Sequence, residues 1–281
     1  MDTKKVSINA YAKVNLTLDV LKKREDGYHE LEGVMQEISL FDEVVIVPAE
    51  DIRVSFDAPI PENNTCVKAA GLFLEGSGLG AHISVKKHIP SEAGLGGASA
   101  DAAAVLKGLN MLYGLHTEKE LFDIGLRVGA DVPFCLLGGC AVARGVGERL
   151  TPVCGMELDL LIVKGSRGVS TGKLFASLDA GREKRSLLSE SSLQKTLESI
   201  ENKDKAALAA RLENALTPAA SLLAPEIPEY VSRMKLLGAL GASMTGSGAA
   251  VFGIFPDEKT ARGAMRHFSD CVFAAVCKTR V

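Results

Sequence analysis

Hydrophobic and polar positions alternate at the start of the chain. Between Val6 and Val20 every second residue is apolar, and Lys13 and Asn15 belong to the other set. A period of two over this length is typical of a β-strand. The pattern therefore places Lys13 and Asn15 on one face of a strand, turned away from the core.

Later segments predict both further strands and helices. Short apolar runs predict strands near residues 37–40, 43–48, 52–56, 82–88, 138–144, 158–163 and 249–255. Helical spacing predicts helices over residues 64–76, 94–114 after a glycine-rich start, and 118–128, and residues 182–216 are helix-prone. Strands with an inserted helix indicate an α+β fold with a mixed or antiparallel sheet. A change of composition near residue 153 suggests two domains, residues 1–153 and 154–281.

Composition excludes several classes of protein. The 281 residues carry a net charge of −3, which argues against a surface for nucleic acid. No apolar run suggests a secretory signal or a membrane span, so we expect a cytoplasmic protein with no membrane partner. The six cysteines form no C-x-x-C pair, and the five histidines lack metal-ligand spacing. We expect reduced core thiols and no structural zinc site. The sequence does not indicate the oligomeric state.

A glycine-rich segment follows the strand predicted near residues 82–88 and leads into a helix. It reads Pro90-Ser-Glu-Ala-Gly-Leu-Gly-Gly-Ala-Ser-Ala-Asp101. Glycines allow close backbone approach, and the first turn of a helix presents unpaired N–H groups, so the segment suits a phosphate chain. It matches neither the P-loop nor the dinucleotide fingerprint, because Ser99 occupies the third glycine position of the latter. A tight turn that packs a helix against a sheet is the alternative.

Three motifs in order resemble those of the GHMP kinases. Residues 90–101 resemble the second family motif, residues 10–16 (AYAKVNL) the first, and residues 241–248 (GASMTGSG) the third. The stretches Asp26-Gly-Tyr-His29 and Gly129-Ala-Asp-Val-Pro-Phe134 are similar to one branch of the family. Within the loop, this chain has Ser91, Glu92, Ala93 and Ala98 where relatives often carry glycine.

The resemblance implies a fold and an activity. The expected fold has an N-terminal domain of the ribosomal protein S5 domain 2-like type and a ferredoxin-like C-terminal domain, with the active site between them. The expected reaction transfers the γ-phosphate of ATP, with Mg²⁺, to the 2-hydroxyl of an erythritol derivative. That small-molecule substrate carries a cytidine diphosphate.

Two residues are expected to carry the chemistry. Asp131 lies in an otherwise uncharged stretch, and the residues alone leave open a helix N-cap or a base that accepts the hydroxyl proton. The resemblance implies the base, acting fully or mainly by positioning the hydroxyl. Lys13 alone would suggest a solvated strand lysine, whereas the resemblance implies that it stabilises the Asp131 carboxylate and the transferred phosphoryl group.

The resemblance also assigns binding residues. Substrate is expected at Asn15, Tyr28, His29, Thr171 and Phe175, with Tyr28 and Phe175 on the faces of the cytosine. The phosphates of ATP are expected on the loop, formed by Pro90, Ser91, Glu92, Ala93, Gly94, Leu95, Gly96, Gly97, Ala98, Ser99 and Ala100. Ser99 is expected near Mg²⁺, Lys87 near the phosphates and Asn64 near adenine. Gly246 and Gly248 are expected to keep the third motif close to the site, and the Glu92 carboxylate to point away from phosphate.

Two other functions remain open on the residues. Another kinase of the family could act on mevalonate, homoserine or a sugar, but the Tyr28–His29 pair then has no clear purpose. A ligand sensor on the same fold would be favoured by loss of the catalytic lysine or aspartate, and both Lys13 and Asp131 are present.

Overall fold

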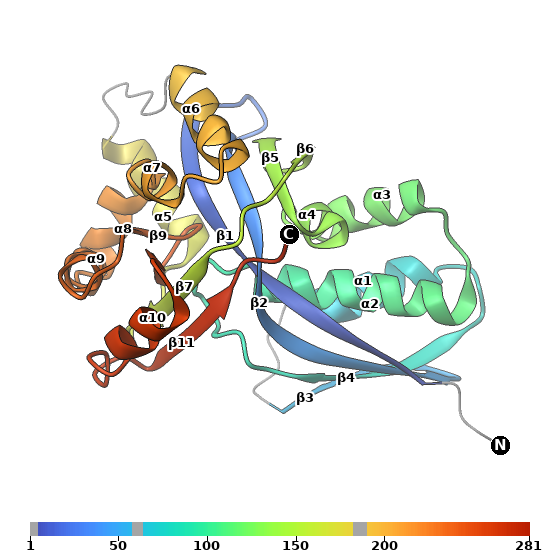
Figure 1. Ribbon diagram of the computed structural model, residues 1–281. Helices are drawn as coiled ribbons and strands as arrows, with labels where there is room; N and C mark the ends of the chain where they lie inside the picture. The colour runs from blue at the N-terminus through green and yellow to red at the C-terminus, as the bar shows by residue number, and fades with distance from the viewer. Residues whose placement is uncertain (1–4, 58–63, 182–189) are drawn as a thin grey trace. The chain divides into compact units, whose positions relative to one another are not determined.

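The computed structural model describes residues 5–57, 64–181 and 190–281 (Figure 1). The chain divides into two compact units, and each combines segments that are distant in sequence. Unit 1 contains Met1–Ala12, Leu40–Ile89 and Gly96–Gly138. Unit 2 contains Lys13–Ser39, Pro90–Leu95 and Gly139–Val281. Each unit has a hydrophobic core of its own.

The elements follow one another as strands first and then helices mixed with strands. The strands are β1 (Val6–Lys23), β2 (His29–Ala49), β3 (Ile52–Phe56), β4 (Gly80–Lys86), β5 (Cys140–Gly145), β6 (Arg149–Val153), β7 (Asp159–Lys164), β8 (Glu213–Asn214), β9 (Gly241–Met244), β10 (Val251–Phe255) and β11 (Phe273–Lys278). The helices are α1 (Thr65–Leu74), α2 (Gly97–Tyr113), α3 (Glu118–Val128), α4 (Val132–Leu137), α5 (Thr171–Gly181), α6 (Glu190–Glu201), α7 (Lys205–Ala209), α8 (Thr217–Leu223), α9 (Glu226–Leu236) and α10 (Glu258–Met265).

Unit 1 is a layer of strands with helices packed on it. The second half of β2 pairs antiparallel with β4, which pairs parallel with β3. Helices α1 and α2 lie side by side, as Figure 1 shows, and α3 and α4 pack beside them. The core contains Phe73, Leu106 and Leu109, each with at most 1% of its surface exposed. This packing fixes the start of α2, which is the end of the glycine-rich loop.

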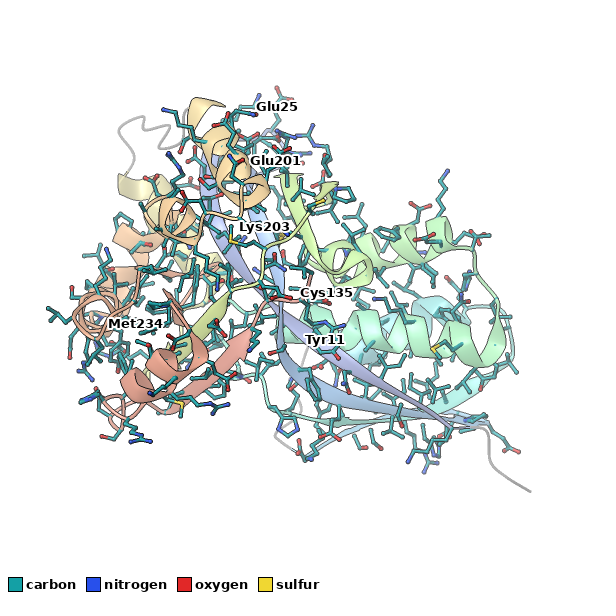
Figure 2. The ribbon with its side chains drawn as sticks, in the orientation of Figure 1. Tyr11, Glu25, Cys135, Glu201, Lys203 and Met234 are labelled. Atoms are coloured by element: carbon teal, nitrogen blue, oxygen red, sulfur yellow. The ribbon has the colours of Figure 1, made fainter. Side chains whose placement is uncertain are left out.

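Unit 2 is built on a four-stranded sheet in the order β11-β7-β10-β9. The pairs within this sheet are antiparallel, and α9 and α10 pack against its strands. Met234 of α9 is buried and lies so close to Gly253 of β10 that a Cβ there would stand 2.8 Å from its sulfur (Figure 2). The first half of β2 pairs with β5, and the second half of β1 pairs with β8.

The predicted α+β class and mixed sheet are confirmed, with differences in detail. Residues 37–40 and 43–48 belong to one strand, β2, rather than to two. The glycine-rich segment near residue 241 begins as strand β9, because its small residues pair with β10. In the helix-prone segment, α6 and α7 lie between residues 190 and 209, whereas residues 182–189 lie outside the described residues. The domain boundary near residue 153 stays a prediction.

All six cysteines lie in the described part of the chain, and none of them is in a disulfide. Cys66, Cys135, Cys140 and Cys277 are buried, as expected for core thiols, and Figure 2 labels Cys135. Burial raises the pKa of the Cys140 thiol to about 12, so it stays protonated at neutral pH. Cys154 is exposed, which corrects the expectation for that residue, because it follows the edge strand β6.

Candidate active site

Lys13 and Asn15 share one face of β1, as the alternation predicted, but that face is buried rather than solvated. Their exposed fractions are 3% and 4%. Lys13 Nζ donates a hydrogen bond of 2.6 Å to Asn15 Oδ1. The Lys13 amide donates to the carbonyl of Leu95, and the Asn15 amide donates to the hydroxyl of Thr245. Two loops therefore cover this part of β1, which is why its polar side chains are not in water.

The covering loops are the first half of the glycine-rich loop and the turn of the third motif, both in unit 2. The amides of Ala249 and Ala250 donate to the carbonyls of Glu92 and Ala93, each over 3.1 Å. The Thr245 hydroxyl also lies 3.3 Å from the carbonyl of Gly94 and donates to it. Backbone groups of residues 92–95 thus pair with β1 on one side and with the third motif on the other.

Gly94 and Gly246 stand at the closest point between these two loops. Gly94 has φ of +72° and Gly246 has φ of +54°, a region that side chains with a Cβ rarely adopt. A Cβ on Gly246 would lie 2.6 Å from the Gly94 carbonyl oxygen, and a Cβ on Gly94 would collide with the backbone of Thr245. The prediction that Gly246 keeps the third motif beside the loop has this physical basis.

Asn214 of β8 holds the third motif from behind, and the sequence did not reveal it. Its buried Nδ2 donates to the carbonyls of Met244 and Gly246, over 3.0 and 2.8 Å. Its Oδ1 accepts from the amide of Leu216. The amide nitrogen therefore holds a turn distant in sequence, while the amide oxygen binds the chain two residues further on. An asparagine in an apolar context was the available signal.

The second half of the glycine-rich loop begins helix α2 in unit 1. Gly96 occupies the N-cap position with φ of +72°, and no side chain caps the helix. The helix therefore presents its first N–H groups and its partial positive charge to a ligand. The side chains of Ala93, Leu95 and Ala100 are buried, so at these positions only the backbone can face a phosphate chain.

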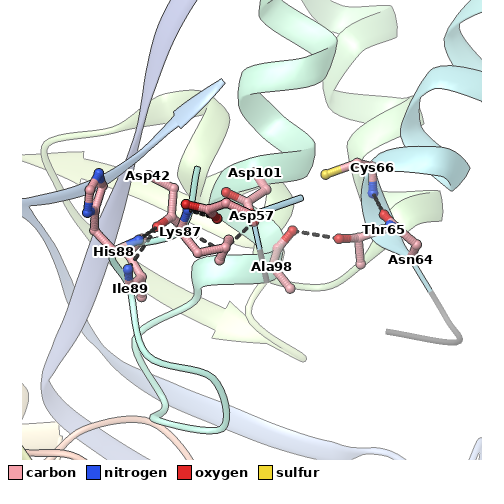
Figure 3. A network of polar contacts seen from close by, with 10 residues as sticks. All are labelled: Asp42, Asp57, Asn64, Thr65, Cys66, Lys87, His88, Ile89, Ala98 and Asp101. Atoms are coloured by element: carbon pink, nitrogen blue, oxygen red, sulfur yellow. Dashed lines mark hydrogen bonds and ion pairs between the residues drawn. The ribbon is translucent and has the colours of Figure 1, made fainter. Parts of the chain in front are cut away.

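Lys87 lies in a buried cluster at this same helix start (Figure 3). Its ammonium binds Asp42 and, over 2.5 Å, Asp101 Oδ2. It lies 3.6 Å from the position that a Cβ on Gly97 would occupy. Burial is the main cause that raises the pKa of Asp101 to about 7. The nearby Asp42 carboxyl group also raises this pKa, whereas the Lys87 ammonium opposes the shift. The structure thus places Lys87 at the start of α2, between two carboxyl groups.

Asp131 occupies the N-cap position of α4 in unit 1, but its side chain does not cap that helix. The alternative that Asp131 is a helix N-cap is therefore correct for its backbone position, but its carboxylate does not accept the capping hydrogen bond. Nearby, a Cβ on Gly129 would lie 4.0 Å from the Ser99 hydroxyl. The segment that carries Asp131 and the first turn of α2 therefore lie next to each other.

Asn64 caps helix α1, since its Oδ1 accepts from the amides of Cys66 and Val67. Its Nδ2 is buried and has no hydrogen-bond partner among the described residues. The next residue, Thr65, donates from its hydroxyl to the carbonyl of Ala98, over 2.8 Å (Figure 3). Asn64 thus lies at the end of the helix that contacts the phosphate loop, with a donor left for a ligand.

His29, Phe175 and Asp179 form one cluster in unit 2. The rings of His29 and Phe175 stack with centroids 4.8 Å apart and 21° between their planes. His29 Nε2 lies 2.8 Å from Asp179 Oδ1, and Lys23 binds the other oxygen of Asp179. These bonds lower the pKa of Asp179, that from Lys23 most. One face of the Phe175 ring therefore packs on His29, and the expected contact of Phe175 with a base stays a prediction.

Thr171 and Tyr28 were also expected to bind the substrate. Thr171, the first residue of α5, exchanges a 2.8 Å hydrogen bond with Ser247 of the third motif. Tyr28 is 64% exposed. Asp179 was missed, although Thr171, Phe175 and Asp179 follow at intervals of four and share one helix face. That spacing was the signal.

Glu92 is one of the loop positions where the chain departs from the family pattern. It has φ of +49°, in the left-handed region. Its carboxylate packs on Gly168, so closely that a Cβ on Gly168 would collide with it. The Glu92 side chain thus lies on the segment that leads into α5. Its direction relative to bound phosphate stays a prediction.

The expected catalytic pair is divided between the units, Lys13 in unit 2 and Asp131 in unit 1. Their approach to each other stays a prediction. In the described ranges, no group of three or more histidine, cysteine, aspartate or glutamate residues could hold a metal ion. Within the same ranges, no helix is long and apolar enough to cross a membrane.

A glycine-rich loop that leads into an uncapped helix start is an arrangement typical of phosphate-binding proteins. The family descriptions GHMP kinases N terminal domain and GHMP kinases C terminal match residues 64–139 and 191–272. The chain belongs to the GHMP kinase family.

Similar proteins indicate which branch of the family this chain resembles. The chain is 40% identical over 275 residues to 4-diphosphocytidyl-2-C-methyl-D-erythritol kinase of Alkaliphilus metalliredigens, covering 95% of this chain and 93% of that one. It is 43% identical over 266 residues to the protein of the same name from Acetivibrio thermocellus, covering 91% and 92%. A crystal structure of 4-(cytidine 5'-diphospho)-2C-methyl-D-erythritol kinase matches with a TM-score of 0.82 and 34% identity, covering 98% and 100%. Homoserine kinase from Cytophaga hutchinsonii shares the fold, with a TM-score of 0.76 and 19% identity, covering 100% of this chain and 96% of that one.

The close approach of the two loops predicts that Gly246→Ala impairs the enzyme. The added methyl group requires both a strained backbone and a shift of the Gly94 carbonyl, costing about 1–3 kcal/mol. We expect a lower free energy of unfolding in urea and a lower kcat.

Gly263→Ala in helix α10 is the matched control, because nothing lies within 4 Å of a Cβ there. It should leave activity unchanged and stabilise by about 0.5–1 kcal/mol. Equal behaviour of the two variants would contradict the role given to Gly246.

Proposed function

We propose that this chain transfers the γ-phosphoryl group of ATP to the 2-hydroxyl of 4-diphosphocytidyl-2-C-methyl-D-erythritol, a step in the non-mevalonate synthesis of isoprenoid precursors. The observation that carries the proposal is 40% identity over 95% of the chain to a kinase named for this substrate. The substrate is a small molecule, and the proposal includes no nucleic acid or membrane partner. The proposed location is the cytoplasm.

In the proposed reaction, the 2-hydroxyl oxygen attacks the γ-phosphorus while the bond to the β-phosphate oxygen breaks and ADP leaves. Asp131 accepts the hydroxyl proton, and Lys13 stabilises the charge that develops on the transferred group. The side-chain bond from Lys13 to Asn15 supports this role, because it fixes the direction of the ammonium. Asn15 in turn binds the erythritol part.

The nucleotide is proposed on the loop from Pro90 to Ala100, with its phosphates on the backbone and the start of α2. Asn64, which has an amide donor without a partner among the described residues, is proposed to bind adenine. Mg²⁺ usually takes one or two protein oxygens together with substrate phosphates. The Ser99 hydroxyl near Gly129 fits that requirement, and Mg²⁺ there would neutralise phosphate charge.

Cytosine recognition is proposed at His29, with Tyr28 available to stack on the base. Because Asp179 is an acceptor, the proton of neutral His29 lies on Nε2, and Nδ1 becomes an acceptor. An acceptor at this point suits the exocyclic amino group of cytosine. Phe175 packs on the His29 ring and is proposed to cover the second face of the base, and Thr171 holds α5 to the third motif.

The acceptor preference tests this proposal. Purified protein with Mg-ATP should release ADP with the cytidyl substrate, and should do so far more slowly with mevalonate or homoserine. A coupled ADP assay with each acceptor at equal concentration measures it. Turnover with mevalonate or homoserine but not with the cytidyl substrate would overturn the proposed activity.

The role of Asp131 predicts that Asp131→Asn loses at least ~100-fold in kcat, the usual scale of a general base. The variant should still bind ADP, since the carboxylate acts on the hydroxyl. Asp123→Asn on the exposed side of α3 is the control and should be active. Near-normal turnover of Asp131→Asn would remove this residue from the mechanism.

A further inference from the structure

Asp42 is completely buried and makes all of its contacts at the entrance to the phosphate loop. One oxygen accepts from the amides of His88 and Ile89, over 2.5 and 2.8 Å, and the other binds the Lys87 ammonium (Figure 3). Pro90 follows directly. This one carboxylate therefore fixes the backbone of His88 and Ile89 and the side chain of Lys87, the three residues that precede the loop.

The same ammonium reaches the other end of the loop. Lys87 binds Asp101, in the second turn of α2, and lies against Gly97, the first residue of that helix. In addition, the Thr65 hydroxyl donates a hydrogen bond to the carbonyl of Ala98. Strand β2, the residues before the loop and the helix after it are thus joined through one nitrogen atom.

Stability alone gives a poor reason for this cluster. It buries two carboxyl groups against one ammonium, and Asp101 Oδ1 has no hydrogen-bond partner among the described residues. Such clusters are costly, and neutral replacements are often tolerated or stabilising. The cluster also puts negative charge beside a site intended for polyphosphate, which by itself disfavours nucleotide. An accurate loop geometry is the gain that can offset both costs.

We propose that Asp42 and Asp101 are positioning residues for the nucleotide, which hold Lys87 and both ends of the phosphate loop in place without touching the nucleotide. The inference rests on the proposed nucleotide site at this loop. It assigns a function to two acidic residues that the reaction itself does not use.

Asp42→Asn tests the inference, because it keeps the oxygen that accepts from His88 and Ile89 and removes the charge that holds Lys87. We expect the dissociation constant for ADP, measured directly by calorimetry at pH 8, to rise at least ~10-fold, the scale of one charged hydrogen bond. The KM for ATP should rise by a similar factor and the KM for the alcohol should stay within about 2-fold. A simple charge effect has the opposite sign, since removing a negative charge would tighten ADP binding.

Glu43→Gln is the matched control, one residue away on the same strand. Glu43 is exposed and binds Lys86 and His88, so its loss should leave ADP affinity unchanged. Asp42→Ala, which also loses the two amide bonds, should bind ADP no better than Asp42→Asn, and Asp42→Glu should recover part of the affinity.

Unchanged or tighter ADP binding by Asp42→Asn would overturn the inference, whether or not its melting temperature changes. Because ADP binding does not require an acceptor, this result is separate from the fate of the proposed reaction. A wild-type chain that binds ADP but phosphorylates no cytidyl substrate would contradict the proposed function and leave the positioning role standing.

Discussion

The backbone pairing of residues 92–95 is the interaction on which unit 2's part of the site depends. Their carbonyls accept hydrogen bonds from the amides of Ala249 and Ala250, directly after the third motif, and the Leu95 carbonyl accepts one from the amide of Lys13. Three segments that are far apart in sequence thereby become neighbours. Only glycine at positions 94 and 246 allows the backbones to come so close. The three family motifs are consequently parts of one structure rather than three separate binding elements.

The electrostatics of the two units follow a common pattern. Each unit places a lysine beside the glycine-rich loop, and Lys13 is buried whereas Lys87 is partly buried. Oxygen partners fix the direction of each ammonium: Asn15 for Lys13 and the two aspartates for Lys87. A buried ammonium that is held in place needs no reorganisation when a phosphate arrives, and this is the source of electrostatic catalysis and of accurate binding. Asn15 is neutral and preserves the charge of Lys13, whereas Asp42 and Asp101 offset that of Lys87.

Local patterns predicted much of the fold and part of the site. Period-two alternation predicted β1, and helical spacing predicted α1, α2 and α3 near their observed bounds. Burial of the Lys13 face could not be predicted, because the loops that cover it come from distant segments. Asn214 and Asp42 were missed for the same reason, since each acts through contacts with residues remote in sequence. The stacking of Phe175 on His29 was not predicted either, because it depends on the orientation of α5.

We propose that the uncapped start of α2 and the loop before it hold the phosphates of the nucleotide. Hydrogen–deuterium exchange with and without Mg-ADP tests it most directly, because amides that bind phosphate exchange more slowly. Residues 96–99 should exchange more slowly when ADP is bound, with little change in α9 and α10. Saturating ADP, verified by calorimetry, that leaves exchange at residues 96–99 unaltered would contradict it.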